Sequence, residues 1–271
     1  MPELPEVETI AGGLDRRIAG ETVESVWLGS KPEPLKSSAE QISAALGGKT
    51  ISSVRRAGKH IVFDLTDRTN GTAGKAQWIV HLGMTGSLRI YPGGADIEKH
   101  THAILGLSSG RELRFIDPRR FGRLSVVGEF RAPGAEPLQI TLNDFISRFH
   151  ERKTPIKSAL LNQKLLSGVG NIYADEALFR AKIRPRRRAA SLTRDELRRL
   201  HSSLKQVLRE AIRAGGSSIS DYVDANGDEG FFQLKHRVYG RESKPCRVCT
   251  TPIKRIVIAG RSSHYCPHCQ K

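Results

Sequence analysis

The sequence has little cysteine, few acidic residues and no long apolar run. Its 271 residues include 4 Cys, all of them after position 245, which excludes a disulfide framework spread over the chain. No apolar stretch approaches the ~20 residues that a membrane-spanning helix needs, and no apolar signal segment follows Met1. We therefore expect a soluble, cytoplasmic protein without a membrane partner.

Basic residues, by contrast, are in excess. Lys and Arg number 44 against 28 Asp and Glu, which gives a formal net charge of +16 and a sequence pI of about 10.1. Such a surplus predicts a polyanionic partner, because each phosphate that a protein neutralises releases condensed counterions. A ribosomal protein, or a basic protein with no specific partner, has the same composition. The length and the 38% of hydrophobic residues allow two domains with ordinary cores.

The first half of the chain has the pattern of a β-sandwich. Apolar residues at helical spacing predict a helix at 5–18, namely Val7, Ile10, Leu14 and Ile18. The period then changes to two, and strands are predicted at 22–28, 50–54, 60–65, 77–82, 87–90, 102–107, 112–116 and 123–127. Short strands separated by Gly, Asp and Ser predict a sandwich domain at 1–131, with a polar loop at 67–75. Two Pro and one Gly within 132–137 predict a linker at 132–140.

The second half changes to helical periodicity. Helices are predicted at 142–149, 156–163 and 172–180, the last with Asn171 as its N-cap. Thr193 and Glu196 form a capping box, which starts a long helix that Gly215 ends. Residues 215–240 are rich in Gly, which predicts a long loop that is either functional or disordered. The fold class is therefore α+β, with a helical domain at 141–240 and a separate C-terminal piece at 241–271.

The C-terminal piece holds the most specific motif. Two Cys-x2-Cys pairs are separated by 16 residues, a spacing typical of a four-cysteine zinc site. The predicted ligands are Cys246, Cys249, Cys266 and Cys269. Four thiolates complete a tetrahedral shell and leave no position open for chemistry. The motif therefore predicts one structural Zn2+ that folds a finger and takes no part in catalysis.

The N-terminal residues Pro2, Glu3 and Glu6 allow two interpretations. Removal of Met1, which is usual when Pro follows, leaves a secondary amine whose pKa of ~7.7–8.0 lies far below the ~10.4 of lysine. Such an amine can attack a sugar C1′ or an aldehyde, and the adjacent carboxylates can move the protons. Alternatively, Pro and Glu simply start a helix and complement its dipole. On these residues alone the second interpretation is favoured.

Two turns between predicted strands carry unusual side chains. Residues 117–122 are Asp-Pro-Arg-Arg-Phe-Gly, and residues 81–86 are His-Leu-Gly-Met-Thr-Gly. Taken alone, Phe121 fits a core position and the arginines fit a solvated turn. An enzyme that extrudes a base must also fill the hole that the base leaves, and Met84, Arg119 and Phe121 are suited to this. Residues 168–171 can clamp a phosphate through backbone amides and Asn171, or form an ordinary helical hairpin.

Taken together, these motifs resemble those of the bacterial formamidopyrimidine-DNA glycosylases. The matching stretches are, in chain order, PELPEVE, GKHIVF, HLGMTG, DPRRFG, GVGNIYADE and the finger that ends CPHCQK. The resemblance implies a monomeric base-excision-repair enzyme with a helix–two-turns–helix element and a zinc finger. It would remove 8-oxoguanine and formamidopyrimidines from damaged double-stranded DNA and then cleave the abasic strand by β,δ-elimination.

The same resemblance implies a role for each matched residue. Pro2 would form a Schiff base at C1′, Glu3 would act as general acid, and Lys59 would serve base excision or a phosphate contact. The DNA-binding residues would be Glu6 at the deoxyribose, Met84, Arg119 and Phe121 in the gap, and Lys157, Asn171 and Arg261. The loop at 215–240 would cover the everted purine.

Two other functions stay open. An endonuclease VIII-like enzyme for oxidised pyrimidines would share Pro2, Glu3 and the finger, so these do not discriminate. The Leu4-Pro5-Glu6 sequence, the two turns and the long loop favour the purine enzyme. A non-catalytic zinc-finger DNA-binding protein would have no need of Pro2, Glu3 and Lys59.

Overall fold

The computed structural model describes residues 1–67, 73–218 and 227–271. The chain divides into two compact units, one of Met1–Arg131 with Gly215–Gly230 and one of Ala132–Ala214 with Phe231–Lys271. The segment Gly215–Gly230, expected in the helical domain, thus groups with the first unit. No helix formed by the described residues is long and apolar enough to span a membrane.

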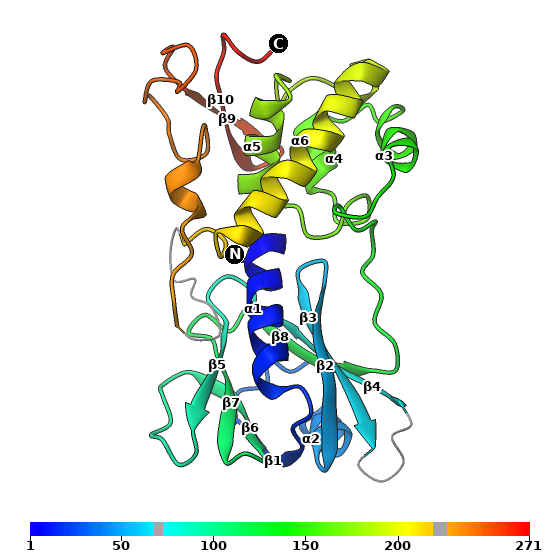
Figure 1. Ribbon diagram of the computed structural model, residues 1–271, viewed down its shortest axis with the longest axis vertical. Helices are drawn as coiled ribbons and strands as arrows, with labels where there is room; N and C mark the ends of the chain where they lie inside the picture. Colours follow the sequence, from blue (N-terminus) through cyan, green and yellow to red (C-terminus); the bar gives the residue numbers. More distant parts are fainter. Residues whose placement is uncertain (68–72, 219–226) are drawn as a thin grey trace. The chain divides into compact units, whose positions relative to one another are not determined.

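Two four-stranded antiparallel sheets form the first unit (Figure 1). One sheet has the order β2-β3-β4-β8, with β2 at Lys49–Ala57, β3 at His60–Asp67, β4 at Ala73–His81 and β8 at Arg123–Val127. The other has the order β1-β6-β7-β5, with β1 at Val23–Leu28, β6 at Thr101–Leu107, β7 at Arg111–Ile116 and β5 at Ser87–Pro92. Phe63, Trp78 and Phe115 contribute to one core between them. The predicted β-sandwich is confirmed.

Two connections cross between the sheets side by side. Residues 82–86 lead from β4 in one sheet to β5 in the other, and residues 117–122 lead back from β7 to β8. His81 of β4 pairs with Arg123 of β8, and Ser87 of β5 pairs with Ile116 of β7. Because the strands at both ends of these connections are paired, the two turns must be neighbours.

Helix α1 (Leu4–Ile18) packs its apolar face into the sandwich core, beside β2 and β3. The four residues predicted from helical spacing are all buried there, namely Val7, Ile10, Leu14 and Ile18. A short helix, α2 (Ala39–Leu46), was not predicted. Ser38 and Gln41 form a capping box at its start, but Ile42 and Leu46 are its only buried residues. Two apolar positions are too few to show a period.

The second unit contains the helices α3 (Leu142–Phe149), α4 (Ile156–Leu161), α5 (Asn171–Arg180) and α6 (Arg194–Arg213), and the 3-10 helices η1 (Ala189–Ser191) and η2 (Phe232–Lys235). Helix α6 packs against α3 and α5. Its predicted capping box is confirmed, because Thr193 Oγ1 accepts from Glu196 N–H (3.2 Å) and Glu196 Oε2 accepts from Thr193 N–H (2.9 Å).

Residues 162–170 join α4 to α5, the pair of the helix–two-turns–helix element. The Gln163 amide holds this connection together, since its Nε2 donates to Leu161 O (2.9 Å) and Val169 O (2.8 Å), and its Oε1 accepts from Gly168 N–H (2.9 Å). Helix α4 ends at Leu161, two residues before the predicted end. Asn171 is the first residue of α5 and Gly170 is its N-cap, so the cap prediction was one residue too late.

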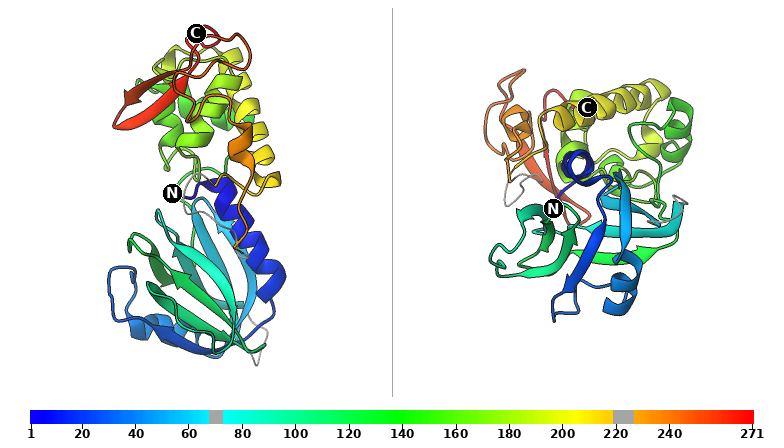
Figure 2. Two further views of the ribbon diagram at one scale, coloured as in Figure 1. Left: turned by 90° about the vertical axis from the view of Figure 1, so that its left-hand side faces the viewer. Right: turned by 60° about the horizontal axis from the view of Figure 1, so that its bottom comes forward.

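The finger contains the hairpin of β9 (Lys254–Ile258) and β10 (Arg261–Tyr265), which extends from the helices of the second unit (Figure 2, left). Ala259 and Gly260 form its turn with φ of 47° and 74°. Positive φ at both positions is typical of the tight turn that matches strand twist. Of the two predicted loops, 67–75 lies partly in β4, 215–240 contains η2, and residues 68–72 and 219–226 lie outside the described residues.

Candidate active site and nucleic-acid contacts

The start of α1 buries two carboxylates. Glu3 is the N-cap and Pro5 lies in the first turn, as the helix-start interpretation predicts. Yet Glu3 and Glu6 are only 4% and 2% exposed, and Pro2 is buried with them. A carboxylate caps a helix equally well in water, and its burial costs free energy. Capping alone therefore does not account for this arrangement.

Glu6 connects α1 to a segment far along the chain. Its Oε2 accepts from Glu3 N–H and its Oε1 accepts from Ser217 N–H, both at 2.8 Å. Gly216 has φ of 84°, and a Cβ there would lie 2.9 Å from Glu6 Cγ. Both the positive φ and the lack of space for a Cβ therefore require glycine at position 216. The bond from Ser217 to Glu6 holds the start of the 215–240 segment beside the start of α1. The predicted deoxyribose contact of Glu6 stays a prediction.

A cavity of about 370 Å³ lies beside the N-terminus. The residues lining it are Met1, His60, His81, Gly83, Met84, Phe121 and Arg123. Met1 is bonded to the Pro2 nitrogen. Removal of Met1 therefore creates the Pro2 amine at the edge of this cavity, next to two of the side chains from the predicted gap-filling turns.

Cationic side chains lie at and near the cavity wall. Arg123 lines the cavity, and Lys59, which is 9% exposed, lies near His81 of the wall. Burial lowers the pKa of His81 to about 4, and the nearby charges of His60, Lys59 and Arg123 act in the same direction. The neutral His81 ring accepts a hydrogen bond at Nδ1 from Gly83 N–H (3.1 Å). Hence Nε2 carries the proton of this imidazole, which leaves it an N–H donor.

The two crossing turns hold the predicted gap-filling side chains at the surface. Met84 is 43% exposed and Phe121 is 52% exposed. The Arg119 guanidinium lies over the Phe121 ring, 4.8 Å from its centroid. Arg120 between them has φ of 56°, a left-handed conformation that costs a non-glycine residue free energy. Phe121 is thus not a core residue, and the turn presents a cation stacked on an aromatic ring.

In the second unit, Asn171 and Arg261 lie close together. Arg261 is exposed at the start of β10. Its neighbour Ser262 accepts from Asn171 Nδ2 through Oγ (3.2 Å), while Asn171 Oδ1 is buried without a hydrogen-bond partner among the described residues. The predicted pair of phosphate contacts is therefore placed on one surface, at the N-terminus of α5.

Lys157, for which the resemblance implies a DNA contact, is buried. The residue is 0% exposed. Its Nζ lies 2.7 Å from Asp175 Oδ1 and donates to Ser262 O (2.5 Å). The ammonium is thus held inside the protein by a carboxylate and a carbonyl, and its contact with DNA stays a prediction. Its contacts within the protein lead to β10, one residue from Arg261.

Asp175 and Glu176, consecutive on α5, hold both sides of the finger. Asp175 accepts from Ser263 Oγ (2.9 Å) and His264 N–H (2.8 Å). Glu176 accepts from the backbone N–H groups of 237–239 at 2.9–3.0 Å. Burial raises the pKa of Glu176, against the effect of these three donors. Helix α5 thus fixes both the segment that enters the finger and β10.

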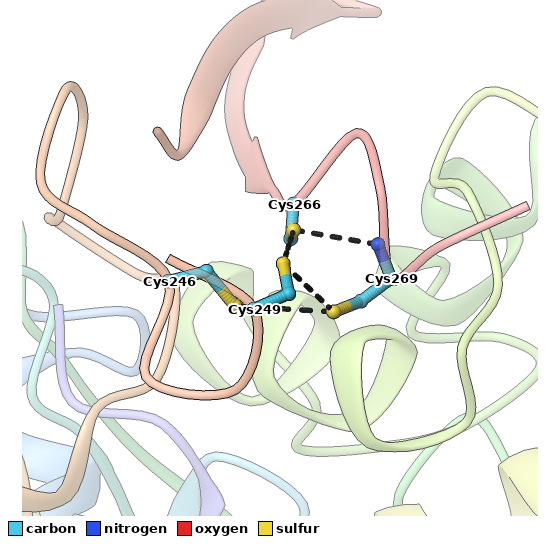
Figure 3. Close-up of side chains that lie close together, drawn as sticks. All are labelled: Cys246, Cys249, Cys266 and Cys269. Carbon is cyan, nitrogen blue, oxygen red and sulfur yellow. Dashed lines mark hydrogen bonds between the residues drawn. The ribbon is translucent and has the colours of Figure 1, made fainter. Parts of the chain in front are cut away.

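The four cysteines converge on one point (Figure 3). All four Sγ atoms lie within 4.8 Å of one another, with separations of 3.3, 3.4 and 4.0 Å for three of the pairs. Bonds of ~2.3 Å to one zinc ion place tetrahedral sulfurs roughly 3.8 Å apart, so the set fits Zn2+. Val248 N–H and Cys269 N–H each point at a sulfur (3.4 Å). The positions of all four sulfurs thus support the prediction of one structural Zn2+.

Sequence reasoning missed the residues that hold these sites in place. Asp117, Asp175, Glu176 and Gln163 were not singled out. Each lies within or beside a motif that was. The signal that could have marked Asp117 is a carboxylate at the start of a turn that contains Pro and Gly. Their buried partners could not be known from the sequence.

Three family models match the chain. The model "Formamidopyrimidine-DNA glycosylase N-terminal domain" matches residues 1–124, "Formamidopyrimidine-DNA glycosylase H2TH domain" matches residues 132–223, and "Zinc finger found in FPG and IleRS" matches residues 243–271.

Full-length relatives and solved structures agree with these models. A formamidopyrimidine-DNA glycosylase of Solibacter usitatus is 46% identical over 279 residues, which is 100% of both chains. Fpg of Lactococcus lactis bound to DNA containing an abasic site has a TM-score of 0.88 at 33% identity, over 99% of each chain. MutM bound to DNA containing carbocyclic 8-oxo-G has a TM-score of 0.89 at 34% identity, over 100% of each chain.

Proposed function

The chain belongs to the formamidopyrimidine-DNA glycosylase family, and on this premise we propose that Pro2 is the nucleophile of its reaction. The enzyme is a bifunctional glycosylase and abasic-site lyase that removes 8-oxoguanine and formamidopyrimidine lesions from duplex DNA. The observation that carries the Pro2 assignment is the cavity. Met1, whose removal frees the amine, lines it together with Met84 and Phe121.

The first step joins the Pro2 nitrogen to C1′ of the damaged nucleotide. The C1′–base bond breaks, the base leaves with a proton, and opening of the sugar ring gives a cationic iminium. Glu3, buried beside Pro2, supplies the proton for ring opening. The iminium then draws electrons from the adjacent C2′–H bond, so that the 3′-phosphate leaves, and a second elimination releases the 5′-phosphate.

Lys59 and the side chains of the two crossing turns stabilise charge and position the strand. Lys59 provides a cation beside the reacting sugar, for base excision or a phosphate contact. Met84, Arg119 and Phe121 enter the space that the everted base leaves, with Arg119 facing the orphaned partner base. Each of these side chains except Lys59 is exposed, as an element that enters a base stack must be.

The second unit supplies DNA contacts of its own. Asn171 and Arg261 hold phosphates at the N-terminus of α5, and Lys157 positions Arg261 through Ser262 and Asp175 rather than touching DNA. The four cysteines hold one structural Zn2+, which keeps the finger folded. We place the enzyme in the bacterial cytoplasm, where its DNA substrate lies.

Borohydride trapping tests the nucleophile. Protein without Met1 is incubated with duplexes that carry 8-oxoguanine, an oxidised pyrimidine or an abasic site, and the reduced protein–DNA adduct is mapped by mass spectrometry. We expect the adduct at Pro2, with 8-oxoguanine excised faster than the pyrimidine. One extra residue before Pro2 should abolish the adduct and leave DNA binding intact, since the charge and the finger are unchanged. A trapped Lys59 peptide with an unmodified Pro2 would overturn the assignment.

A further inference from the structure

The two crossing turns that carry Met84, Arg119 and Phe121 share one buried carboxylate. Asp117 is 0% exposed. Its Oδ1 accepts from the Thr85 hydroxyl (2.5 Å) and from Arg119 N–H (3.2 Å), and its Oδ2 accepts from Gly122 N–H (2.7 Å). A single side chain therefore shapes the turn 117–122 and ties it to the turn 82–86.

The backbone of Asp117 is hydrogen-bonded to β6 and to His100, the residue that precedes β6. Its N–H donates to His100 O, and its carbonyl accepts from His102 Nε2–H, both at 3.0 Å. His102 is 5% exposed. The backbone of Asp117 is therefore held at the sheet that contains β6. Because both turns bond to its carboxylate, this sheet also holds the tips of the turns in place.

The backbones of the two turns leave no space between them. A Cβ on Gly83 would lie 2.6 Å from Gly122 N, and a Cβ on Gly122 would lie 2.4 Å from Phe115 Cζ. Contacts this close leave only glycine at both positions. Neither turn can shift far without moving the other, and the Thr85–Asp117 hydrogen bond locks them in one register.

We propose that Asp117 and Thr85 are positioning residues for base extrusion. They hold the wedge, defined as Met84, Arg119 and Phe121, in the arrangement that enters the base stack. The conformational entropy of ordering the two turns is therefore already lost in the free enzyme and does not add to the barrier for base extrusion. The inference rests on the proposed function of the wedge. It assigns a role in the known reaction to a carboxylate and a hydroxyl that touch neither the nucleophile nor the metal site.

The most specific test removes only the hydrogen bond between the turns, which the Thr85 hydroxyl donates to Asp117. Thr85→Val keeps the shape of the side chain and both Asp117 bonds within its own turn, but removes the hydroxyl. Thr85→Ser keeps the hydroxyl. Thr22→Val is the matched control, because the Thr22 hydroxyl is 3.2 Å from the Thr50 hydroxyl in the same unit, away from the turns. Single-turnover cleavage is measured on an 8-oxoguanine duplex and on a preformed abasic site, and 2-aminopurine beside the lesion reports extrusion.

Thr85→Val should slow both 8-oxoguanine excision and the fluorescence change about tenfold, which corresponds to about 1.4 kcal/mol in the barrier. Cleavage of the abasic site, which has no base to extrude, should change about twofold at most. Thr85→Ser should restore excision, and Thr22→Val should treat both substrates alike. The thermal midpoint of Thr85→Val should match that of Thr22→Val.

Equal losses on both substrates, no loss on either, or a Thr85→Ser variant as slow as Thr85→Val would overturn the inference. The double variant Arg119→Ala/Phe121→Ala separates this failure from failure of the wedge itself. If the double variant discriminates between the substrates and Thr85→Val does not, the wedge stands and only its positioning by Asp117 is wrong. If the double variant does not discriminate, the wedge assignment fails.

Discussion

Asp175→Asn should loosen the finger from the rest of the second unit. Asp175 and Lys157 are 1% and 0% exposed and their charges lie 2.7 Å apart, with Ser263 and His264 bound to the same carboxylate. The amide removes the countercharge of a buried ammonium and places a donor where an acceptor is needed. Removing one partner of a buried ion pair costs ~3–5 kcal/mol. We expect about 3 kcal/mol, the low end of that range, because Lys157 keeps its bond to Ser262 O.

The assay is thermal unfolding combined with DNA affinity. At ~2–4 °C per kcal/mol, a loss of about 3 kcal/mol lowers the midpoint by about 6–12 °C. The affinity for an abasic-site duplex should fall about tenfold, because Arg261 lies two residues from Ser263 and loses its position. Zinc content should stay at one per chain, since the cysteines are untouched. Adding Lys157→Met should recover part of the stability, because it removes the uncompensated charge.

Glu210→Gln is the matched control. Glu210 forms a bidentate pair with Arg180 of the same helix α5 at 2.7 and 2.8 Å, but its side chain is 36% exposed. Solvent screens such a pair, so we expect a loss of about 1 kcal/mol or less. An Asp175→Asn variant no less stable than Glu210→Gln, or one with unchanged DNA affinity, would refute the reasoning.

Three further predictions follow from the geometry. Arg119→Ala with Phe121→Ala should slow 8-oxoguanine excision at least ten times more than abasic-site cleavage, by roughly the few kcal/mol that unstacking costs; parallel rate measurements check this, and equal losses contradict it. Cys249→Ser, or chelation of the zinc, should unfold the β9–β10 hairpin and weaken DNA binding through Arg261; affinity that survives with zinc shown to be absent means the ligands are misassigned. His81 has a folded pKa of about 4 against ~6.5 unfolded, so only the unfolded state binds a proton between those values and stability falls as pH drops through that window. His81→Asn should remove about 2 kcal/mol of this acid sensitivity, measured as the difference between the two unfolding curves from pH 7 to 4.5.

The strands were predictable because their pattern is local. In a sandwich, each strand buries one face, so period two is written directly into the sequence, and all eight predicted strands correspond to strands of the sandwich. Helix α2 was not predicted because its two buried residues, Ile42 and Leu46, are too few to show a helical repeat of apolar positions. The fold class and the finger could thus be predicted, while short elements whose stability comes from packing could not.

The residues of the candidate site also fall into two groups, those in local motifs and those that act through distant partners. Pro2, Arg119 and the cysteines lie in linear motifs, and their chemistry can be argued from residue type and spacing. Asp117 and Asp175 act through partners 32 and 88 residues away, a pairing that only the folded chain reveals. Lys157 is an example: the family resemblance implies a DNA contact, and the fold places its ammonium inside the protein beside Asp175. Sequence gives the type of a charged group, and the fold decides what it faces.

The consecutive carboxylates of α5 also bear on how the finger exchanges its metal. Glu176 holds the backbone at 237–239, before the first cysteine pair, and Asp175 holds Ser263 and His264, before the second. The segments that lead into the two pairs are therefore tethered to one helix independently of the sulfurs. The entropy of bringing the two cysteine pairs together is then largely met by packing within the second unit, not by the metal. We expect loss of Zn2+ to open the knuckles and to separate β9 from β10, while 237–239 and Ser263–His264 keep their bonds to α5. We therefore expect a returning ion to meet two half-sites at high effective concentration, so that the finger reloads its metal without refolding of the unit that carries it.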